Sequence, residues 1–366
     1  MLMKKDDTEF KLGFDAENDF GDIQLDKEAD EYLFFERFKM QLFVRKDISE
    51  DMLIVDLRGI SKPAVDVFSK AIRALKDHLL NHLKSMGRGI NPDNIKWILT
   101  IPAIWNDKAK IFMRMSAEKA GIKKEQPCFA LEPEAAAMYC QHDYRESNEM
   151  NDLPNFLKQG AKYLIVDIGG GTLDMTAHQK VVHDRVKELC RPSGAACGGT
   201  TVDNAFLKML EKIVGEAVMK ALKEKHSLHY FDLMREFEAL KRSISSRSND
   251  KVSLGFPEET FNNLCKEVNK NFEQVLQESE FKDKVSIRSN KLCIGKEIIE
   301  SFIRNAADKI IKEIKKTMDQ VEDSQTIETL LIVGGFSESE IVYKALRTAF
   351  PQQKVISDFM IQLFQL

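Results

Sequence analysis

Three consecutive glycines, at positions 169–171, constrain the fold of this chain more than any other feature of its sequence. The residues before them (163–168) are apolar except for Asp167, as in a buried strand. After them, apolar and polar residues alternate from 172 to 178, which is the period of a second strand. The glycines therefore join two strands, and their backbone N–H groups can approach an anion closely because no Cβ intervenes.

Three kinds of phosphate loop use glycines in this way. A P-loop needs GxxxxGK[ST], and the sequence contains no such string. A dinucleotide-binding loop needs a helix after its glycines, whereas a strand pattern follows here. A hairpin-type phosphate loop remains, with an unliganded glycine-rich turn as the alternative. A carboxylate beside a phosphate is repulsive unless a cation lies between them, so Asp167 implies Mg²⁺ or an oriented water.

A second strand runs into glycines near the end of the chain, in LLIVGGFSESEIV (330–342). There Ser337 and Ser339 precede a helical pattern. Gly334 and Gly335 would let a flat ring or a phosphate approach the backbone. Two such loops in one chain predict opposite walls of one nucleotide cleft.

Composition places the chain among globular α/β proteins. Its 366 residues can bury a large core and predict two domains or lobes. A formal charge of -4 gives no basic field for nucleic acid. No apolar run approaches the length of a membrane-spanning helix, and the start MLMKKDDTEF lacks the core of a signal peptide, so a cytoplasmic address is expected and a membrane partner is not.

Neither the cysteines nor the histidines predict a metal site. The six cysteines form no CxxC pair, which favours reduced and packed thiols. His78 and His82 are four residues apart and could share a helical face with a metal, but no HExxH surrounds them and no third ligand is implied, so a solvated face is the better interpretation. His226 and His229 are expected at the surface.

Periodicity predicts the remaining elements. The first 30 residues resemble short strands and turns, and the segment from Leu131 resembles a short loop followed by an alanine-rich helix. The polar stretch 145–160 is the expected hinge between lobes. Helices are predicted over 62–84, 108–121, 198–222, 226–246, 296–320 and 339–350, and strands over 95–105, 251–256, 284–295 and 330–333.

Together these motifs resemble the actin-like ATPase domain of the heat shock 70 kDa proteins, a two-lobed α/β fold of ribonuclease H-like type. VDIGGGTLDM is similar to that family's second phosphate motif and LIVGGFSESEIV to its adenosine motif. WILTIPAIWNDKAKIFMRMSAEKAGI, LEPEAAAMYC and REFEALKRSISS resemble further motifs in the family's order. FERFKMQLF, Trp105 and the phenylalanine of GGFSES resemble the divergent branch of heat shock 70 kDa proteins 12A and 12B.

The resemblance implies an ATP or ADP site with Mg²⁺. Asp167 matches the carboxylate that holds the Mg²⁺ shell through water and orients the attacking water, and Glu132 matches an acidic residue on the opposite wall. Lys39 matches the catalytic lysine, and Thr172 belongs to the phosphate loop. The implied nucleotide-binding residues are Gly169, Gly170, Gly171, Thr172, Gly198, Gly199, Thr200, Glu238, Lys241, Arg242, Ser245, Gly334, Gly335 and Ser337.

One part of this set has a simpler alternative. Glu238, Lys241, Arg242 and Ser245 fall on one helical face at i, i+3, i+4 and i+7. Such a face is also typical of a solvated, charged helix.

The chain also departs from the family's pattern. The resemblance covers about Lys11 to Pro351, and residues 1–38 contain no DxGT-like string, the family's first phosphate loop. The sequence therefore predicts an incomplete lobe I (1–158), lobe II (159–355) and an atypical tail (356–366) without a peptide-binding domain. An exposed sheet edge would follow, and an incomplete coding sequence is favoured over evolved loss.

Three functions remain open. The first is an ATP-binding and ATP-hydrolysing, chaperone-like protein of the stress response, with protein clients or co-chaperones as partners. The second is a catalytically impaired pseudo-ATPase that acts as a nucleotide-gated interaction scaffold. The third is a sugar or metabolite kinase, which ranks last because no aspartate stands out as the general base of a hexose site.

Overall fold

The computed structural model describes residues 1–26, 28–43, 48–123, 125, 128–147, 155–181, 185–245, 248–266, 269–322 and 327–357. Helices and strands alternate along these ranges, so the fold is mixed α/β, as the sequence predicts. The helices, in chain order, are α1 (Phe14–Leu25), α2 (Phe38–Phe43), α3 (Ala64–Ser85), α4 (Asp107–Lys119), α5 (Glu132–Ser147), α6 (Thr200–Val214), α7 (Glu216–Lys225), α8 (Ser227–Ser243), α9 (Glu258–Cys265), α10 (Phe272–Glu278), α11 (Lys296–Met318) and α12 (Glu340–Ala349).

The strands form one large sheet and four small ones. They are β1 (Leu2–Lys4), β2 (Phe10–Lys11), β3 (Tyr32–Phe34), β4 (Leu53–Val55), β5 (Ser61–Pro63), β6 (Ile98–Ile101), β7 (Cys128–Leu131), β8 (Lys162–Ile168), β9 (Leu173–Lys180), β10 (Val186–Glu188), β11 (Ser193–Ala195), β12 (Lys251–Gly255), β13 (Val285–Arg288), β14 (Lys291–Gly295), β15 (Ile327–Val333) and β16 (Lys354–Ser357). The small sheets have the orders β2-β1-β3, β12-β14-β13, β4-β5 and β6-β7.

The large sheet has the order β10-β9-β8-β15-β16, and β11 also pairs with β9. Its central strand β8 runs parallel to β15 and antiparallel to β9. Leu164 and Val166 belong to the apolar cluster that includes α6 and α11, while Tyr163 and Ile165 belong to the cluster that includes α5. Because successive side chains of a strand point to opposite faces, a strand covered on both faces is a continuous apolar run.

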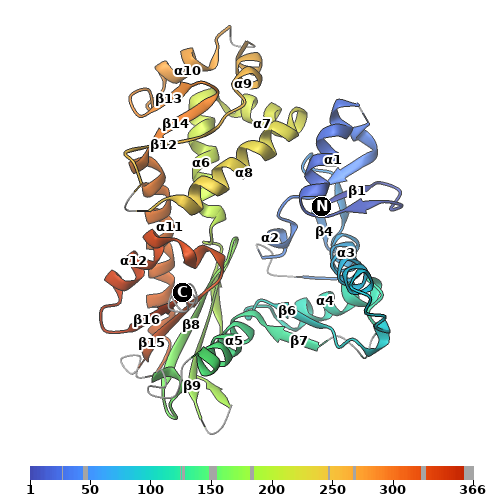
Figure 1. Ribbon diagram of the computed structural model, residues 1–366, viewed down its shortest axis with the longest axis vertical. Helices are drawn as coiled ribbons and strands as arrows, with labels where there is room; N and C mark the ends of the chain where they lie inside the picture. The colour runs from blue at the N-terminus through green and yellow to red at the C-terminus, as the bar shows by residue number, and fades with distance from the viewer. Residues whose placement is uncertain are drawn as a thin grey trace.

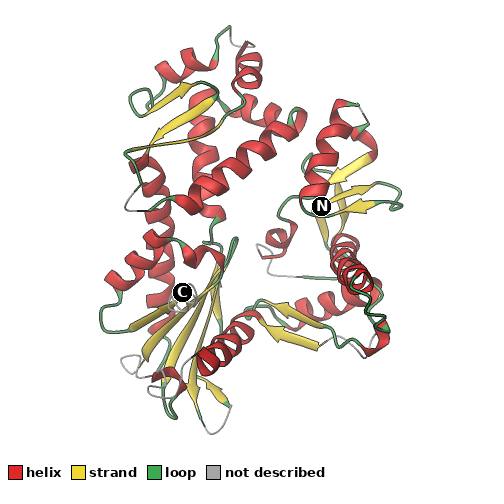
Figure 2. Cartoon of the chain, in the orientation of Figure 1, coloured by secondary structure: helices red, strands yellow, loops and turns green. Residues whose placement is uncertain are grey.

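Two arms of the molecule flank an open space in Figure 1. One arm contains the large sheet and α6 to α12, and the other contains β1 to β5 with α1 to α4. At the base, α5, β6 and β7 lie between the arms, and Figure 2 shows the strands of the small sheets within each arm. The arms also meet where Arg235 Nε of α8 lies 3.0 Å from Glu17 Oε2 of α1, so elements distant in sequence enclose the space.

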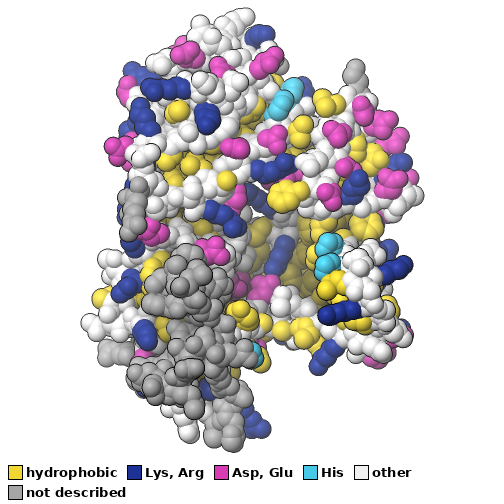
Figure 3. Space-filling view, viewed as in Figure 1, with side chains coloured by type: hydrophobic (Ala, Val, Ile, Leu, Met, Phe, Trp, Pro, Cys, Tyr) yellow, Lys and Arg dark blue, Asp and Glu magenta, His cyan; other side chains and the backbone are white. Residues whose placement is uncertain are grey.

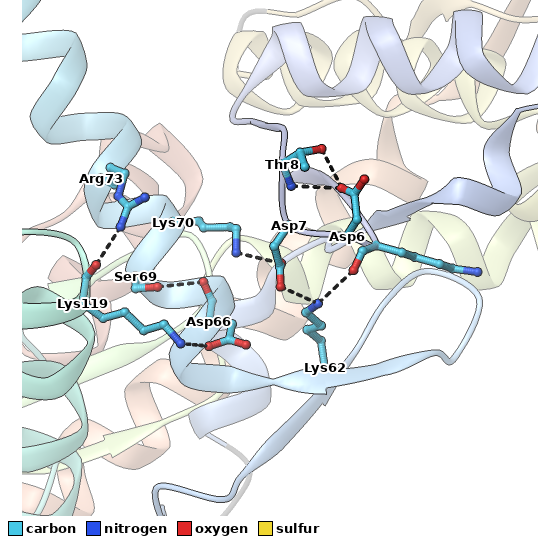
Figure 4. A network of polar contacts seen from close by, with 10 residues as sticks. Asp6, Asp7, Thr8, Lys62, Asp66, Ser69, Lys70, Arg73 and Lys119 are labelled. Atoms are coloured by element: carbon cyan, nitrogen blue, oxygen red, sulfur yellow. Dashed lines mark hydrogen bonds and ion pairs between the residues drawn. The ribbon is translucent and has the colours of Figure 1, made fainter.

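A polar network holds α3 against its neighbours (Figure 4). Asp7, in the turn between β1 and β2, pairs with Lys62 of β5 at 3.0 Å and with Lys70 of α3 at 2.8 Å. Asp66, in the first turn of α3, pairs with Lys119 at the end of α4. The turn between β1 and β2 and the end of α4 are thereby both tied to the N-terminal part of α3.

Several local predictions are confirmed. The helix expected over 62–84 is α3, in which His78 and His82 are exposed. The helix expected over 108–121 is α4, and the side-chain oxygen of Asn106 caps its start by accepting a hydrogen bond from Ala109 N at 3.0 Å. The glycine run joins β8 and β9 as a hairpin. His226 and His229 are exposed, and all six cysteines are free thiols, although Cys128 is exposed and not packed as expected.

Three local predictions are wrong. Residues 14–25 form α1 instead of strands and turns. The helix expected over 198–222 is interrupted at Gly215, whose φ of 90° is incompatible with a continuing helix. A strand, β7, precedes α5 where a loop is expected.

The predicted lobe boundaries are left open by the structure. The expected hinge at 145–160 lies mostly outside the described residues, and β16 runs across the expected boundary at 355 and 356. In the small sheet of β6 and β7, Ile98 is 59% exposed. Within the described ranges, no helix has the combination of length and hydropathy required for a bilayer span.

Removing the ring of Phe206 is expected to destabilise the fold. Phe206 of α6 and Phe237 of α8 are both fully buried, with ring centroids 4.0 Å apart in a stacked arrangement. A Phe206→Ala variant should lose about 4 kcal/mol of unfolding free energy in urea denaturation, because the side chain leaves a cavity. Leu25→Ala is the matched control: Leu25 is 74% exposed, and its loss should change the free energy by less than about 0.5 kcal/mol. Equal effects of the two variants would contradict this packing.

Candidate functional site

Two cavities adjoin the glycine hairpin, and they share one residue. The first, here called the carboxylate cavity, has a volume of about 250 Å³, and the second, called the α8 cavity, about 240 Å³. Gly170 lines both, so the two cavities are neighbours along one cleft. Figure 3 shows a hollowed centre between the arms, with basic and acidic side chains beside it.

Most of the predicted residues lie around these two cavities. The carboxylate cavity is lined by Lys39, Glu132, Asp167, Gly169, Gly170, Gly171 and Thr172. The α8 cavity is lined by Gly170, Gly199, Glu238, Lys241, Arg242 and Gly335.

Two aspartates meet at the end of the central hairpin. Asp167 of β8 is paired in register with Asp174 of β9, and directly paired residues of antiparallel strands point to the same face. Burial, reinforced by the charge of Glu132, raises the pKa of Asp167 to about 6, against a smaller opposing effect of Lys39. Burial also raises the pKa of Asp174 to about 6. In the absence of a bound cation, ionisation of either carboxylate therefore costs free energy.

Lys39 and Glu132 face each other across the carboxylate cavity. Lys39 Nζ lies 2.6 Å from Glu132 Oε1. Lys39 comes from α2 in one arm, while Glu132 is the first residue of α5. The ion pair brings a cation to the cavity that holds Asp167, which is the combination that a phosphate with a divalent cation requires.

The glycine loop presents free backbone donors. Gly169 N donates to Thr172 O at 2.9 Å and closes the turn. Within the part of the chain that the structure describes, no acceptor is found for the N–H groups of Gly170 and Gly171. Met40 Sδ lies against Gly171, where a Cβ would clash with it. An anion in the carboxylate cavity could accept hydrogen bonds from this loop.

The second glycine turn behaves differently from its prediction as a phosphate-side turn. The N–H groups of Gly198, Gly199 and Thr200 donate to the carbonyls of Gly171, Gly169 and Gly170, at 3.2, 3.2 and 2.6 Å. The first N–H groups of a helix have no partner within the helix, and here the glycine loop supplies their acceptors. The start of α6 thus supports the loop from behind.

The charged face of α8 is held by a buried aspartate. Lys241 Nζ lies 2.7 Å from Asp203 Oδ1, and Arg37 Nη2 of the other arm lies 2.8 Å from Asp203 Oδ2. Arg242 Nε lies 2.9 Å from Glu238 Oε1 at the exposed edge of the same face. This face of α8 is therefore not the fully solvated helix face that was the simpler alternative, because Lys241 is only 7% exposed.

Three predicted residues have local structural contacts instead of lining either cavity. Gly334 has a φ of 88° and packs on Asp167 and Ile168 so closely that a Cβ would clash. Ser337 Oγ donates to Gly334 O at 2.6 Å within the turn before α12. Ser245 N donates to Ser248 Oγ at 3.0 Å beyond the end of α8.

The prediction from sequence misses Asp174, Asp203 and Glu338. Asp174 carries a signal, since it lies on the polar face of β9 together with Thr172. Asp203 could not be identified from spacing, because its partner Arg37 is 166 residues away. Glu338 lines the α8 cavity; the pKa of Arg242 is raised mainly by its hydrogen bond to Glu238, and the charge of Glu338 adds to the rise.

The donor set fits a Mg²⁺ ion that is bound together with phosphates. The described residues contain no group of three or more His, Cys, Asp or Glu side chains placed to hold a metal by themselves. Mg²⁺ commonly takes one or two carboxylates and completes its shell with water and phosphate oxygens. Asp167 supplies a half-buried carboxylate at the wall of the carboxylate cavity, and Asp174 supplies a buried one behind that wall, whose Oδ1 has no hydrogen-bond partner among the described atoms.

Comparison with known proteins gives one family and several relatives. A family model described as "Domain of unknown function (DUF8340)" matches residues 158–356. Heat shock 70 kDa protein 12A of Homo sapiens is 28% identical over 390 residues, which cover 93% of this chain and 58% of that protein. Heat shock 70 kDa protein 12B of Homo sapiens is 27% identical over 398 residues, 95% of this chain and 58% of that protein.

A bacterial relative is more distant. The chaperone protein HscA homolog of Acinetobacter baumannii (strain SDF) is 24% identical over 305 residues, 83% of this chain and 40% of that protein. The chain spans about 58% of the length of the human relatives.

Replacing Asp174 by its neutral isostere should stabilise the chain in a pH-dependent way. The folded-state pKa is about 6, raised from 3.8, so between pH 4 and 6 the folded chain keeps a proton that the unfolded chain has released. The stability of the wild-type chain therefore falls as the pH rises through this window. Asp174→Asn should be more stable by about 2 kcal/mol at pH 7.5, and by less at pH 5, in urea denaturation without Mg²⁺.

The matched control for this experiment is Asp30→Asn, since the Asp30 side chain is fully exposed. Its stability difference from the wild type should be small and independent of pH. A loss of stability in Asp174→Asn at pH 7.5 would contradict the proposed cost of ionisation.

Proposed function

We propose that this chain, which belongs to the family described as "Domain of unknown function (DUF8340)" and is related to the heat shock 70 kDa proteins, binds ATP with Mg²⁺ and hydrolyses it. The site is the cleft that contains the two cavities. The fold that supports this function is an actin-like ATPase fold, with 1–158 and 159–355 as its two lobes.

One observation carries the proposal: two cavities with different linings meet at Gly170. The carboxylate cavity offers Lys39, two carboxylates and free backbone donors. The α8 cavity offers the ring of Phe336 and the side chains of α8. A nucleotide has a phosphate chain at one end and a flat base at the other. It can therefore fill both cavities if its phosphate chain passes beside Gly170.

Positioning and charge neutralisation are the chemistry that phosphoryl transfer requires. Lys39 would neutralise charge on the terminal phosphate, and the N–H groups of Gly170 and Gly171 would bind its oxygens. Asp167 and Asp174 would hold Mg²⁺. When bound, this ion would offset the negative charge shared by the phosphates and the carboxylates.

The carboxylates would also orient the attacking water. Asp167 lines the carboxylate cavity and, as a carboxylate, can accept one hydrogen bond of that water. Glu132 lines the same cavity and can accept the second hydrogen bond of that water. Loss of either carboxylate should therefore affect turnover more than binding.

Asp167→Asn is expected to separate binding from hydrolysis. The variant keeps the shape of the side chain and removes its charge, so ATP affinity should change by less than about tenfold while phosphate release falls by roughly a hundredfold or more. Calorimetric titration with Mg²⁺ and ATP measures the first, and a phosphate-release assay the second. Asp30→Asn is the control and should retain both. Unchanged phosphate release in Asp167→Asn would refute the role of Asp167.

A nucleotide-gated scaffold is the second candidate function. The contacts between the arms favour it: Arg37 binds Asp203, Lys223 lies 3.0 Å from Glu36, and Arg235 binds Glu17. Such pairs can couple closure of the cleft to its contents. ATP binding without phosphate release in the wild-type chain would support the scaffold over the ATPase.

A chaperone-like role is proposed from the relatives alone. The names of the relatives include "heat shock" and "chaperone", which supports a proposal of protein clients, co-chaperones and a cytoplasmic stress response for this chain. Suppression of the aggregation of a heat-denatured model client, with and without ATP, would test it.

A further inference from the structure

We propose that Arg37 sets the charge of the α8 cavity from outside it: its guanidinium neutralises Asp203, so that the positive charge of Lys241 stays available to a bound nucleotide. This inference rests on the proposed function. Arg37 is then a positioning residue that acts through Asp203, and it belongs to the arm opposite α8.

Asp203 lies between two cations. It belongs to the first turn of α6 and is only 5% exposed. Lys241 Nζ lies 2.7 Å from its Oδ1, and Arg37 Nη2 lies 2.8 Å from its Oδ2. A buried charge requires compensating partners, and here each carboxylate oxygen has one cation.

The wall of the α8 cavity is balanced in charge only when Arg37 is counted. The described residues that line this cavity include two acidic and two basic side chains, those of Glu238, Glu338, Lys241 and Arg242. Their charges cancel. Asp203 adds a negative charge to this wall through its contact with Lys241, and Arg37 offsets that charge. Without Arg37, the wall would carry a net negative charge, which opposes the binding of an anion such as a nucleotide.

The other acidic neighbour of Arg37 has a cation of its own. Glu36 Oε2 lies 3.0 Å from Lys223 Nζ, whereas Arg37 Nε lies 3.8 Å from Glu36 Oε1. The shortest ion pair of Arg37 is therefore the one with Asp203. Since Arg37 comes from the other arm, a contact between the arms sets the charge of the α8 cavity.

The backbone at Arg37 is strained where it directs this side chain. Its φ is 48°, in the left-handed region that only glycine adopts without cost. Arg37 directly precedes α2, and its carbonyl accepts a hydrogen bond from Met40 N at 2.9 Å. Strained residues persist where surrounding contacts hold them, and the ion pair with Asp203 is such a contact.

The test measures the affinity for ADP with Mg²⁺ in calorimetric titrations. Arg37→Gln should lower this affinity roughly tenfold, because a positive charge is lost beside a site for an anion. Arg37→Lys keeps the charge and should stay within about threefold of the wild type. Glutamine and lysine meet the same left-handed backbone as arginine, so the two variants differ mainly in charge.

Arg235→Gln is the matched control. It removes another cation that joins the arms, since Arg235 Nε lies 3.0 Å from Glu17 Oε2. Arg235 is not among the described residues that line the α8 cavity. The affinity of this variant for ADP should stay within about twofold of the wild type.

A double variant separates charge from structure. In Arg37→Gln with Asp203→Asn, the uncompensated negative charge is gone, and Lys241 keeps Glu238 as its partner. The affinity for ADP should therefore return to within about threefold of the wild type. If the ion pair had a structural role only, the double variant would bind ADP no better than Arg37→Gln.

The outcomes distinguish this inference from the proposed function. If the wild-type chain binds ADP and Arg37→Gln binds it equally well, the role of Arg37 is overturned and the proposed function stands. The same holds if Arg37→Lys is as weak as Arg37→Gln, if Arg235→Gln is equally weak, or if the double variant regains no affinity. If the wild-type chain binds no ADP, both proposals are overturned.

Discussion

The pairing of Asp167 with Asp174 across the β8–β9 hairpin is the constraint on which the arrangement of the cleft depends. Burial removes hydration from both carboxylates and the nearby charge of Glu132 adds to this effect, which raises the pKa of each to about 6. The fold keeps them together because every other residue of β8 and β9 on that face is covered by protein. Two carboxylates held close together in this way favour the binding of a cation.

The glycine loop, the start of α6, and residues of α2 and α5 surround this pair of aspartates. The glycine loop follows Asp167 directly and precedes Asp174, so the loop and the carboxylates cannot be separated by any movement of the arms. The start of α6 satisfies its own N–H groups on the carbonyls of the loop, which leaves the opposite side of the loop free. Lys39 and Glu132 then complete the cavity from α2 and α5.

Local features were predictable from the sequence, whereas long-range ones were not. The hairpin and the Asn106 cap follow from spacing over a few residues. α1 could not be predicted, because its stripe of buried residues is thin and contains Gly21, which packs on Leu228 of α8. A tertiary contact overrides weak local propensity there. Likewise, Gly215 lies in an apolar pattern that continues across it, so the interruption of the helix leaves no mark on periodicity.

The same distinction applies to the site. The residues of the glycine motif were identified from their order, and the structure brings most of them to two adjoining cavities. The partners of α8 were missed because Asp203 is contributed by another helix, and Arg37 by another arm. Spacing along the chain carries no information about contacts between residues that are distant in sequence.

Gly170 connects the two cavities, and its environment has a consequence for how natural variation would act on this protein. Apart from its two neighbours in sequence, no described residue has a heavy atom within 4 Å of the point where a Cβ at this position would be. A methyl group would therefore meet no obstacle during folding and would project into the passage alone. Natural selection at position 170 would therefore act on how a ligand passes between the two cavities. A measurement of thermal stability would not detect the effect of such a substitution.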